Sequence, residues 1–364
     1  MKKHLAFFIF FIVSKLIFSD YATGVKLFNE GKYEEALLRF EELMREQPNQ
    51  WQSFYYAGLC YQKLNKIDKA KEAFEKGLSL KDELSIRLPL SQIYFSEKNY
   101  EKVLEVLKIE SLKDAKTEVK KSAYKLISTS YYLLGKYKEA VPFYKEYLLL
   151  DSDPTIKYYL GFCLYKTESF EESAQILEEV IKIDPQYLEA GTLLASVYLE
   201  LVNLNPSKKE FYLKNAENIG QKLVGFSGEY SYLLAKIYMM NGKYSQALEY
   251  FESATKQKDK TQVCYSYYYI GFLKAKLENF KGALSAFELA EKCLNDEAAL
   301  KKIYCQKGLI YHNQSDFQRA IELYEKGGCP KDLLDQAKAG KQASDSLRRM
   351  KDLIEQLQDL TKMK

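Results

Sequence analysis

Histidine is nearly absent from this chain of 364 residues, which holds only His4 and His312. Imidazole is the usual acid–base group near neutral pH and the commonest metal ligand, so its scarcity removes most ways of building such a site. The sequence also lacks a Gly-rich phosphate loop, His-Glu-x-x-His and Cys-x-x-Cys motifs and a serine nucleophile elbow. We therefore predict that the protein is not an enzyme and uses neither a cofactor nor a metal ion.

A large excess of charge is also missing. The 54 basic and 50 acidic residues give a net charge of +4, and Lys2, Lys3 and Lys15 supply three of these charges at the N-terminus. The rest of the chain is almost neutral, whereas sequence-independent binding of nucleic acid needs a concentrated basic surface. We expect no nucleic-acid partner.

The longest apolar run lies within the first nineteen residues. Lys2 and Lys3 precede an apolar stretch over residues 5–13, and the small residue Ser19 follows before Asp20. This is the order of a secretory signal peptide. We predict that residues 1–19 are a signal peptide, cleaved after Ser19, and that the mature protein is exported to the bacterial periplasm with no stable membrane span. The apolar stretch falls well short of the ~20 residues that cross a bilayer, so an uncleaved N-terminal anchor is the alternative.

What the chain does contain is a repeat. Turn-like triplets recur about every 34 residues, with one interval of two periods between Phe170 and Tyr244. Most are flanked by a small and a larger residue spaced three or four apart, such as Gly58 with Tyr61 upstream, which puts both on one helix face. Each repeat is thus predicted to be two antiparallel helices whose small residues allow close approach. The triplets are Gly31-Lys32-Tyr33, Asn65-Lys66-Ile67, Lys98-Asn99-Tyr100, Gly135-Lys136-Tyr137, Glu168-Ser169-Phe170, Gly242-Lys243-Tyr244, Glu278-Asn279-Phe280 and Ser315-Asp316-Phe317.

The pattern resembles the tetratricopeptide repeat family, most closely over residues 51–61 and 242–254. The resemblance covers residues 20–329 as about nine units, the sixth of which carries an insertion near residues 203–211. It implies an all-α fold, an α-solenoid of stacked antiparallel helix pairs that forms a superhelix.

Cys60 and Cys163 occupy equivalent places in units three repeats apart, and we expect both to be small core residues. One disulfide among Cys264, Cys293 and Cys305 is conceivable in an oxidising compartment, but helix-end geometry makes it the less favoured outcome.

Residues 330–364 form a different pattern, an amphipathic helix with Leu347, Met350, Ile354 and Leu357 at spacings of three and four. A stack of repeats leaves an apolar face at its end, and we expect this C-terminal helix to cap it. A short coiled coil that makes a homodimer is the alternative. We favour the cap because fewer than three clean heptads are available.

In the family, the first helices line a concave groove that holds an extended or helical segment of a partner. Applied to this chain, the resemblance selects the side chains just before and after each small residue of the first helices, and most of these side chains are aromatic. Each could instead be a half-buried packing residue, and both interpretations stay open. Some members hold a carboxylate in a Lys/Asn clamp; Lys125 with Thr129 is only a partial imitation, so we do not predict that clamp. The predicted groove residues are Tyr55, Leu59, Phe95, Tyr132, Tyr158, Phe162, Tyr165, Tyr232, Met239, Tyr265, Tyr268 and Phe272.

The resemblance and the predicted signal peptide together lead us to expect a non-catalytic scaffold of the cell envelope that binds a protein or peptide partner in an aromatic-lined groove. Burial of apolar surface would give affinity, and tyrosine hydroxyls would give specificity. The alternative is an accessory module that positions a partner enzyme in envelope assembly or polysaccharide export.

Overall fold

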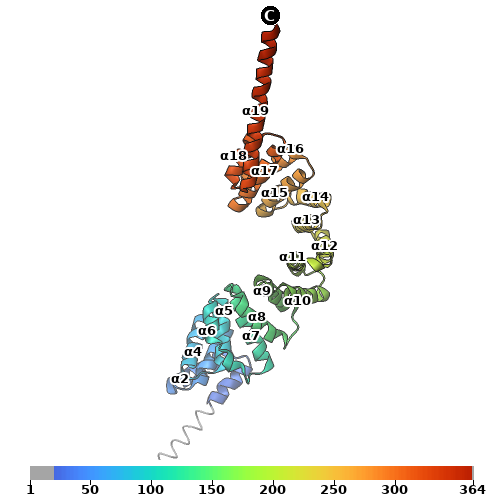
Figure 1. The fold of residues 1–364 in the computed structure, drawn as a ribbon. Coiled ribbons are helices and arrows are strands. Elements are labelled where there is room, and N and C mark those ends of the chain that lie inside the picture. Colours follow the sequence, from blue (N-terminus) through green and yellow to red (C-terminus); the bar gives the residue numbers. More distant parts are fainter. Residues whose placement is uncertain (1–19, 363–364) are drawn as a thin grey trace, which may run out of the picture. The chain divides into compact units, whose positions relative to one another are not determined.

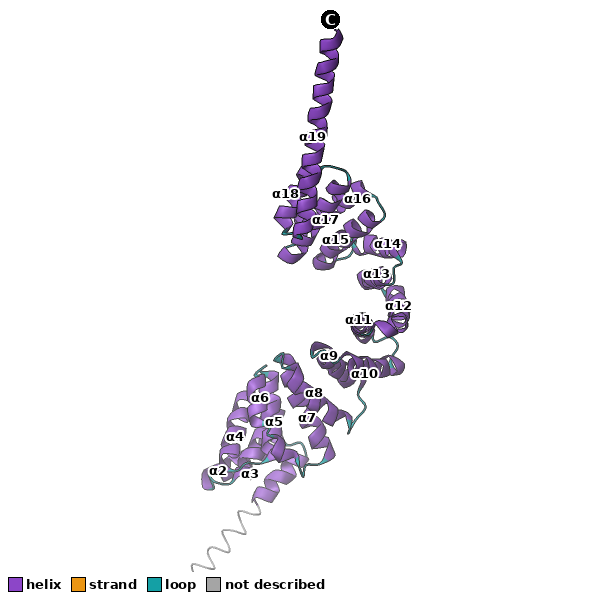
Figure 2. Ribbon diagram, viewed as in Figure 1, coloured by secondary structure: helices purple, strands orange, loops and turns teal. Residues whose placement is uncertain are grey.

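The computed structural model describes residues 20–362 and is built from helices joined by short loops, as Figures 1 and 2 show. Within these residues there is no β-strand. The fold is thus the predicted all-α solenoid of helix pairs. The signal peptide predicted for residues 1–19 lies outside the described residues. The chain divides into two compact units, Met1–Pro185 and Gln186–Lys364, and each is described by itself.

Unit 1 contains five helix pairs within its described residues. Each pair has a first helix and a second helix that packs against it. The first pair consists of the helical residues 20–29 and α2, and a short 3₁₀ helix, η1, lies between the third and fourth pairs. The bounds are α2 Tyr33–Glu46, α3 Trp51–Lys63, α4 Ile67–Leu80, α5 Leu84–Ser96, α6 Tyr100–Val106, η1 Ile109–Leu112, α7 Thr117–Leu133, α8 Tyr137–Leu148, α9 Pro154–Lys166 and α10 Phe170–Ile183.

Unit 2 contains four further pairs and a long terminal helix in the part that is described. In its first pair, α11 and α12 have 17 and 18 residues, against 13 and 14 in α3 and α4. The bounds are α11 Leu188–Leu204, η2 Pro206–Lys208, α12 Lys209–Phe226, η3 Gly228–Tyr230, α13 Ser231–Met240, α14 Tyr244–Ala254, α15 Lys260–Lys276, α16 Phe280–Cys293, α17 Glu297–Asn313, α18 Phe317–Gly327 and α19 Lys331–Lys362.

Left-handed backbone residues mark the turns within the pairs. Every predicted triplet begins with a residue of positive φ, from 56° at Asn65 to 78° at Gly31. The following amide donates back into the first helix, as from Lys136 N–H to the Tyr131 carbonyl at 2.9 Å. This 6→1 bond is the Schellman closure of a helix end. The turn prediction is therefore confirmed at all eight triplets.

Close packing explains the small residues of the repeat. A Cβ added at Gly58 would lie 2.6 Å from Cε1 of Phe74, and one added at Gly271 would lie 2.6 Å from Cδ1 of Phe287. Both phenylalanine side chains are fully buried. Because carbon atoms pack at about 3.5–4.0 Å, no side chain fits at either glycine, and the aromatic ring fills the space instead.

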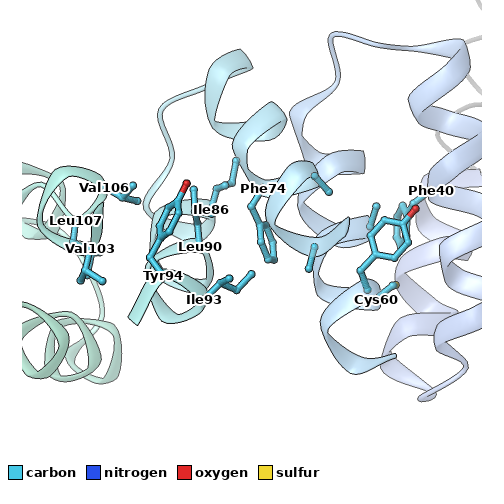
Figure 3. Close-up of a cluster of buried hydrophobic side chains, with 14 of the residues drawn as sticks. Phe40, Cys60, Phe74, Ile86, Leu90, Ile93, Tyr94, Val103, Val106 and Leu107 are labelled. Carbon is cyan, nitrogen blue, oxygen red and sulfur yellow. The ribbon is translucent and has the colours of Figure 1, made fainter. Parts of the chain in front are cut away.

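One cluster of buried side chains in unit 1 extends from α2 to α7, and a second lies between α8 and α9. Figure 3 shows side chains of α2 to α6 lying in one row, among them Phe40, Cys60, Phe74 and Leu90. Cys60 is fully buried there, and Cys163 is fully buried in the cluster around Tyr144. Both free cysteines are core residues, as predicted.

A buried arginine stabilises the third pair, whose second helix has only seven residues. Arg87 is 5% exposed. Its Nε donates to Asp82 Oδ1 at 2.5 Å, and its Nη1 donates to the carbonyl of Val106 at the end of α6. The guanidinium thus supplies a partner for a carbonyl that the short helix leaves without one.

The C-terminal helix caps the array with other residues than those predicted. Leu333, Leu334 and Ala337 pack against the cluster around Tyr324 of α18, and a Cβ at Gly340 would lie 2.5 Å from Phe317. The predicted stripe lies beyond this contact: Leu347, Met350 and Ile354 are exposed. The expectation that these side chains face the array is wrong, because α19 extends past the last pair. The side chain of Leu357 lies outside the described residues.

Unit 2 contains two disulfides rather than the single one considered conceivable. Cys264 of α15 pairs with Cys293 of α16, with Cα atoms 5.8 Å apart, and Cys305 of α17 pairs with Cys329, with Cα atoms 5.7 Å apart. Each joins the two helices of one pair, or the residues just beyond them. Cys329, which the sequence analysis left out, is a partner because the left-handed Gly328 turns the chain back after α18.

Candidate partner-binding grooves

All twelve predicted groove residues lie on first helices, and all are half-buried. Seven belong to unit 1 and five to unit 2. Several also pack against core clusters, including Tyr55 and Phe95 in unit 1 and Tyr232 in unit 2. Half-burial fits both interpretations, so the binding role of these residues stays a prediction.

Unit 1 has a pocket of about 490 Å³ whose nine lining residues all come from the first helices α5, α7 and α9. We call it the unit 1 pocket. Its apolar wall consists of Phe95, Leu126, Ile156 and Tyr159, and its polar residues are Gln92, Ser122, Lys125, Thr129 and Thr155. An apolar surface with a few polar groups around it is the usual composition of a binding site. Of the predicted set, only Phe95 lines this pocket.

Three further aromatic rings continue the apolar wall from Tyr159: Tyr132 on α7, Tyr137 on α8 and Phe162 on α9. Tyr132 lies 5.0 Å from Tyr159 and 5.5 Å from Phe162 between ring centroids, and Tyr137 lies 5.7 Å from Phe162. The rings meet edge to face, the arrangement favoured by aromatic quadrupoles. The structure thus brings the predicted Tyr132 and Phe162 together, with Tyr159 linking them to the unit 1 pocket.

Positive charge borders this aromatic surface. Lys125 lies on the pocket wall, 55% exposed, with Nζ 3.9 Å from Asp153 Oδ2. Asp153 is engaged as the cap of α9, where Oδ1 accepts the amide of Thr155 at 2.8 Å. Lys166 places Nζ 5.4 Å from the centroid of Phe162 and 5.8 Å from that of Tyr165. An acidic or neutral partner fits this border better than a basic one.

Unit 2 has a second pocket of about 490 Å³, lined by α11, η3, α13, the segment that leads into α15 and the first turn of α15. It is more polar than the unit 1 pocket, and its lining includes Glu229, Lys236, Lys258 and Asp259. Tyr232 is the one predicted residue in it; its ring lies 5.8 Å from that of buried Phe251. The two units therefore offer surfaces of different character.

Tyr265 has an engaged hydroxyl. It donates to Asp296 Oδ2 at 2.6 Å, and Asp296 Oδ1 accepts the amide of Ala298 at 2.9 Å as the cap of α17. The ring thus connects α15 to the start of α17. A structural role accounts for this contact, although Tyr265 also lines a smaller cavity of about 400 Å³ beside Cys264 and Cys293.

The groove tyrosines remain hydrogen-bond donors at physiological pH. Burial raises the pKa of Tyr132 to about 12 and also raises the pKa of Tyr55, Tyr232 and Tyr268. The hydrogen bond to Asp296 is the largest cause of the raised pKa of Tyr265. Because none of these phenols ionises near neutral pH, each keeps its proton, and Tyr132 can donate it to a carbonyl or carboxylate of a partner, whereas Tyr265 already donates to Asp296.

Sequence reasoning missed Leu126, Tyr159 and Leu233, three apolar residues that line the two pockets. Each stands two positions before the small residue of its first helix. At about 100° per residue, this position lies about 200° around the helix from the small residue. The small residue faces the second helix, so the residue two positions before it faces away from the second helix. Selecting residues by this offset would have identified all three.

Two negative findings concern other kinds of site. Among residues 20–362, no group of three or more His, Cys, Asp or Glu is placed to hold a metal ion. Within the same described part, no helix is both long and apolar enough to cross a membrane.

Comparison with known families agrees with the repeated helix pairs. The family model for intraflagellar transport protein 56 matches residues 21–227, more than half of the chain, and a tetratricopeptide repeat model matches residues 228–261 and 301–327. The chain belongs to the family of the first model and is a tetratricopeptide repeat protein. The word transport in that name describes the protein after which the model is named, and we do not infer a transport role for this chain from it. No curated protein matches the sequence.

Solved tetratricopeptide repeat structures resemble the chain only in fold. MamA from Desulfovibrio magneticus RS-1 is 19% identical and matches 48% of this chain and 94% of that chain, with a TM-score of 0.43. The C-terminal part of a repeat protein from Cytophaga hutchinsonii is 16% identical and matches 77% and 98%, with a TM-score of 0.41. The P58(IPK) repeat domain is 16% identical and matches 90% and 99%, with a TM-score of 0.32. The family assignment does not depend on these likenesses.

Proposed function

We propose that this tetratricopeptide repeat protein is a non-catalytic scaffold of the bacterial cell envelope that holds a segment of a partner protein on its first helices. The observation that carries the proposal is the unit 1 pocket together with the adjoining rings of Tyr132 and Phe162. Half-exposed aromatic rings beside a pocket are typical anchors of protein interfaces. The phenol of Tyr132 adds a directional hydrogen bond to a partner's backbone.

The chemistry of the partner segment follows from the same surface. The wall accepts apolar or aromatic side chains, and Lys125 and Lys166 favour a segment that carries negative charge. Such a segment lies across α5, α7 and α9, whose side chains alone line the pocket. Its backbone can accept hydrogen bonds from tyrosine hydroxyls that remain protonated.

Two features support export. The first nineteen residues have the order of a signal peptide, which predicts release of the mature protein into the periplasm, with an uncleaved anchor as the alternative. The Cys264–Cys293 and Cys305–Cys329 pairs suit an oxidising compartment, since cytosolic thiols are kept reduced. N-terminal sequencing and fractionation test the proposal. Native protein that begins at Met1 and stays in the cytoplasm would refute it.

The binding experiment starts with site-specific photocrosslinking from Phe95 in cells, followed by affinity measurements with the partner so identified. Phe95→Ala and Tyr159→Ala are compared with Leu38→Ala, whose side chain is 61% exposed on α2. Each groove variant should weaken binding about tenfold or more, as loss of an interface anchor does, whereas Leu38→Ala should not. Melting curves verify that each variant is folded. Equal affinities for all three variants would contradict the groove.

The same crosslinking experiment distinguishes the scaffold from the alternative, an accessory module that positions a partner enzyme. If the captured partner is an enzyme of envelope assembly or polysaccharide export, its activity should fall with Phe95→Ala in proportion to the loss of binding. A scaffold without that role would leave the partner's activity unchanged.

A further inference from the structure

The distal half of α19 presents an apolar face that nothing in the described chain covers. The proximal half is fixed to α18, where Lys338 pairs with Glu325 at 3.3 Å and Lys341 donates to Gln318. Beyond it, Leu347, Met350, Leu353 and Ile354 are 58%, 59%, 60% and 48% exposed. At about 100° per residue, these four side chains lie within about 60° of the direction of Met350. They form one stripe.

Charges around this stripe are sorted by sign. Arg349 and Lys351 lie about 100° to either side of Met350 and so form its two borders. By the same rotation, the acidic residues Asp345, Asp352 and Glu355 lie about 140° or more from Met350, on the far side of the helix. No acid borders the stripe within residues 342–356.

We propose that this segment, residues 342–356 of α19, is a membrane-surface helix that lies on an anionic phospholipid bilayer with its apolar stripe against the acyl chains. Basic residues at the border of an apolar face can extend along it and keep their charge at the lipid phosphates. The acids on the opposite side face water. The helix lies on the membrane and does not cross it.

The border charges argue against a second copy of the chain as the occupant. With Leu347 and Ile354 at a and Met350 at d, Lys351 takes an e position, and the preceding g position is Ser346. Partner choice in coiled coils depends on opposite charges at e and g. An antiparallel pair puts Lys351 against its own counterpart, and a parallel pair puts it against Ser346, so neither gains an ion pair.

Co-sedimentation of the full mature chain with vesicles tests the proposal. We expect binding to vesicles of phosphatidylglycerol and phosphatidylcholine at 1:1, and at least tenfold weaker binding to phosphatidylcholine alone. Each basic side chain at an anionic surface contributes about fivefold, so the charge reversal Arg349→Glu should weaken binding roughly 25-fold. The matched control is Arg348→Glu, one residue earlier and on the far side, which should cost less than about fivefold.

A second variant tests the stripe itself. Leu353→Asn with Ile354→Asn should abolish vesicle binding and leave the melting temperature of the array unchanged, because neither side chain contacts it. Equal binding to neutral vesicles, equal losses for the two arginine variants, or no vesicle binding would overturn the proposal. The proposal would also be overturned if the natural protein did not bind vesicles, formed a dimer in light scattering, and became monomeric with the two asparagine substitutions. The groove variant Phe95→Ala should bind vesicles normally, so this inference and the proposed function fail independently.

Discussion

The change Gly161→Leu tests the packing that forms each helix pair. Gly161 of α9 faces Leu177 of α10, and a Cβ built on it would lie 2.8 Å from both Cγ and Cδ2 of that leucine. Leu177 is fully buried. Because carbon atoms pack at about 3.5–4.0 Å, the two helices must separate or Leu177 must leave its rotamer.

The expected loss follows from two opposing contributions. Overpacking a filled core costs about 1–3 kcal/mol, and a whole leucine side chain belongs at the upper end of that range. Replacing a helical glycine by leucine returns almost 1 kcal/mol of helix propensity. The free energy of unfolding should therefore fall by about 2 kcal/mol, which lowers the melting temperature by roughly 4–8 °C for a cooperative unit of the size of unit 1, Met1–Pro185.

Gly225→Leu is the matched control. Gly225 also lies within a helix, α12, but a Cβ there meets no atom within 4 Å. This variant gains helix propensity without overpacking, so it should be as stable as the natural protein or more stable by up to about 1 kcal/mol. Thermal melts of both variants decide the question. If Gly161→Leu is as stable as Gly225→Leu, the close approach of α9 and α10 does not limit the side chain, and the reasoning fails.

Four further predictions concern individual groups. Reduction of both disulfides, which close loops with sequence separations of 29 and 24 residues, should lower the free energy of unfolding by about 3.5 kcal/mol for each bond in the chain-entropy account; a melt unchanged by reductant would contradict this. Burial raises the pKa of Cys60 and Cys163 to about 12, so neither should be alkylated at pH 8 until the protein unfolds, as mass spectrometry can verify. Arg87→Leu should cost about 1–3 kcal/mol in a urea titration because a buried carbonyl loses its donor; no loss would exclude that role. The Tyr265 hydroxyl lowers the pKa of Asp296 in the folded protein. The resulting gain in stability is fully present above the pKa that Asp296 has in the unfolded chain, and it is lost as the pH falls through the lower pKa of the folded state. The stability difference between the natural protein and Tyr265→Phe should thus be present at neutral pH and vanish in acid.

The helix pairs could be predicted from the sequence because their determinants are local and repeated. The turn at Glu168 and the glycine at position 58 each appear at a fixed place in the period, and eight copies outweigh any one irregular unit. Family resemblance then supplied the direction in which the first helices face. Half-burial of all twelve groove residues agrees with that direction, but local spacing does not separate a packing ring from a binding ring.

Other features depend on distances that no local pattern contains. Cys329 pairs with Cys305 because the chain turns back at Gly328, and spacing alone gave no reason to choose Cys329. The stripe of α19 has the same spacing whether it covers the array or lies free. Its actual position depends on Gly340, which fits closely against Phe317 and fixes where the cap ends.

The turns within the pairs have a consequence for how the array opens. Five of them place a residue other than glycine in the left-handed region: Asn65, Lys98, Glu168, Glu278 and Ser315, with φ between 56° and 62°. Such a backbone costs an ordinary side chain roughly 1–2 kcal/mol, and asparagine less. In a repeat protein this cost remains within one pair and its neighbours. Pairs closed by lysine or glutamate should therefore exchange their amide hydrogens sooner than pairs closed by glycine, except the eighth pair, which the Cys264–Cys293 disulfide holds together. Partial unfolding should begin at the third and fifth pairs, while the pairs closed at Gly31, Gly135 and Gly242 persist.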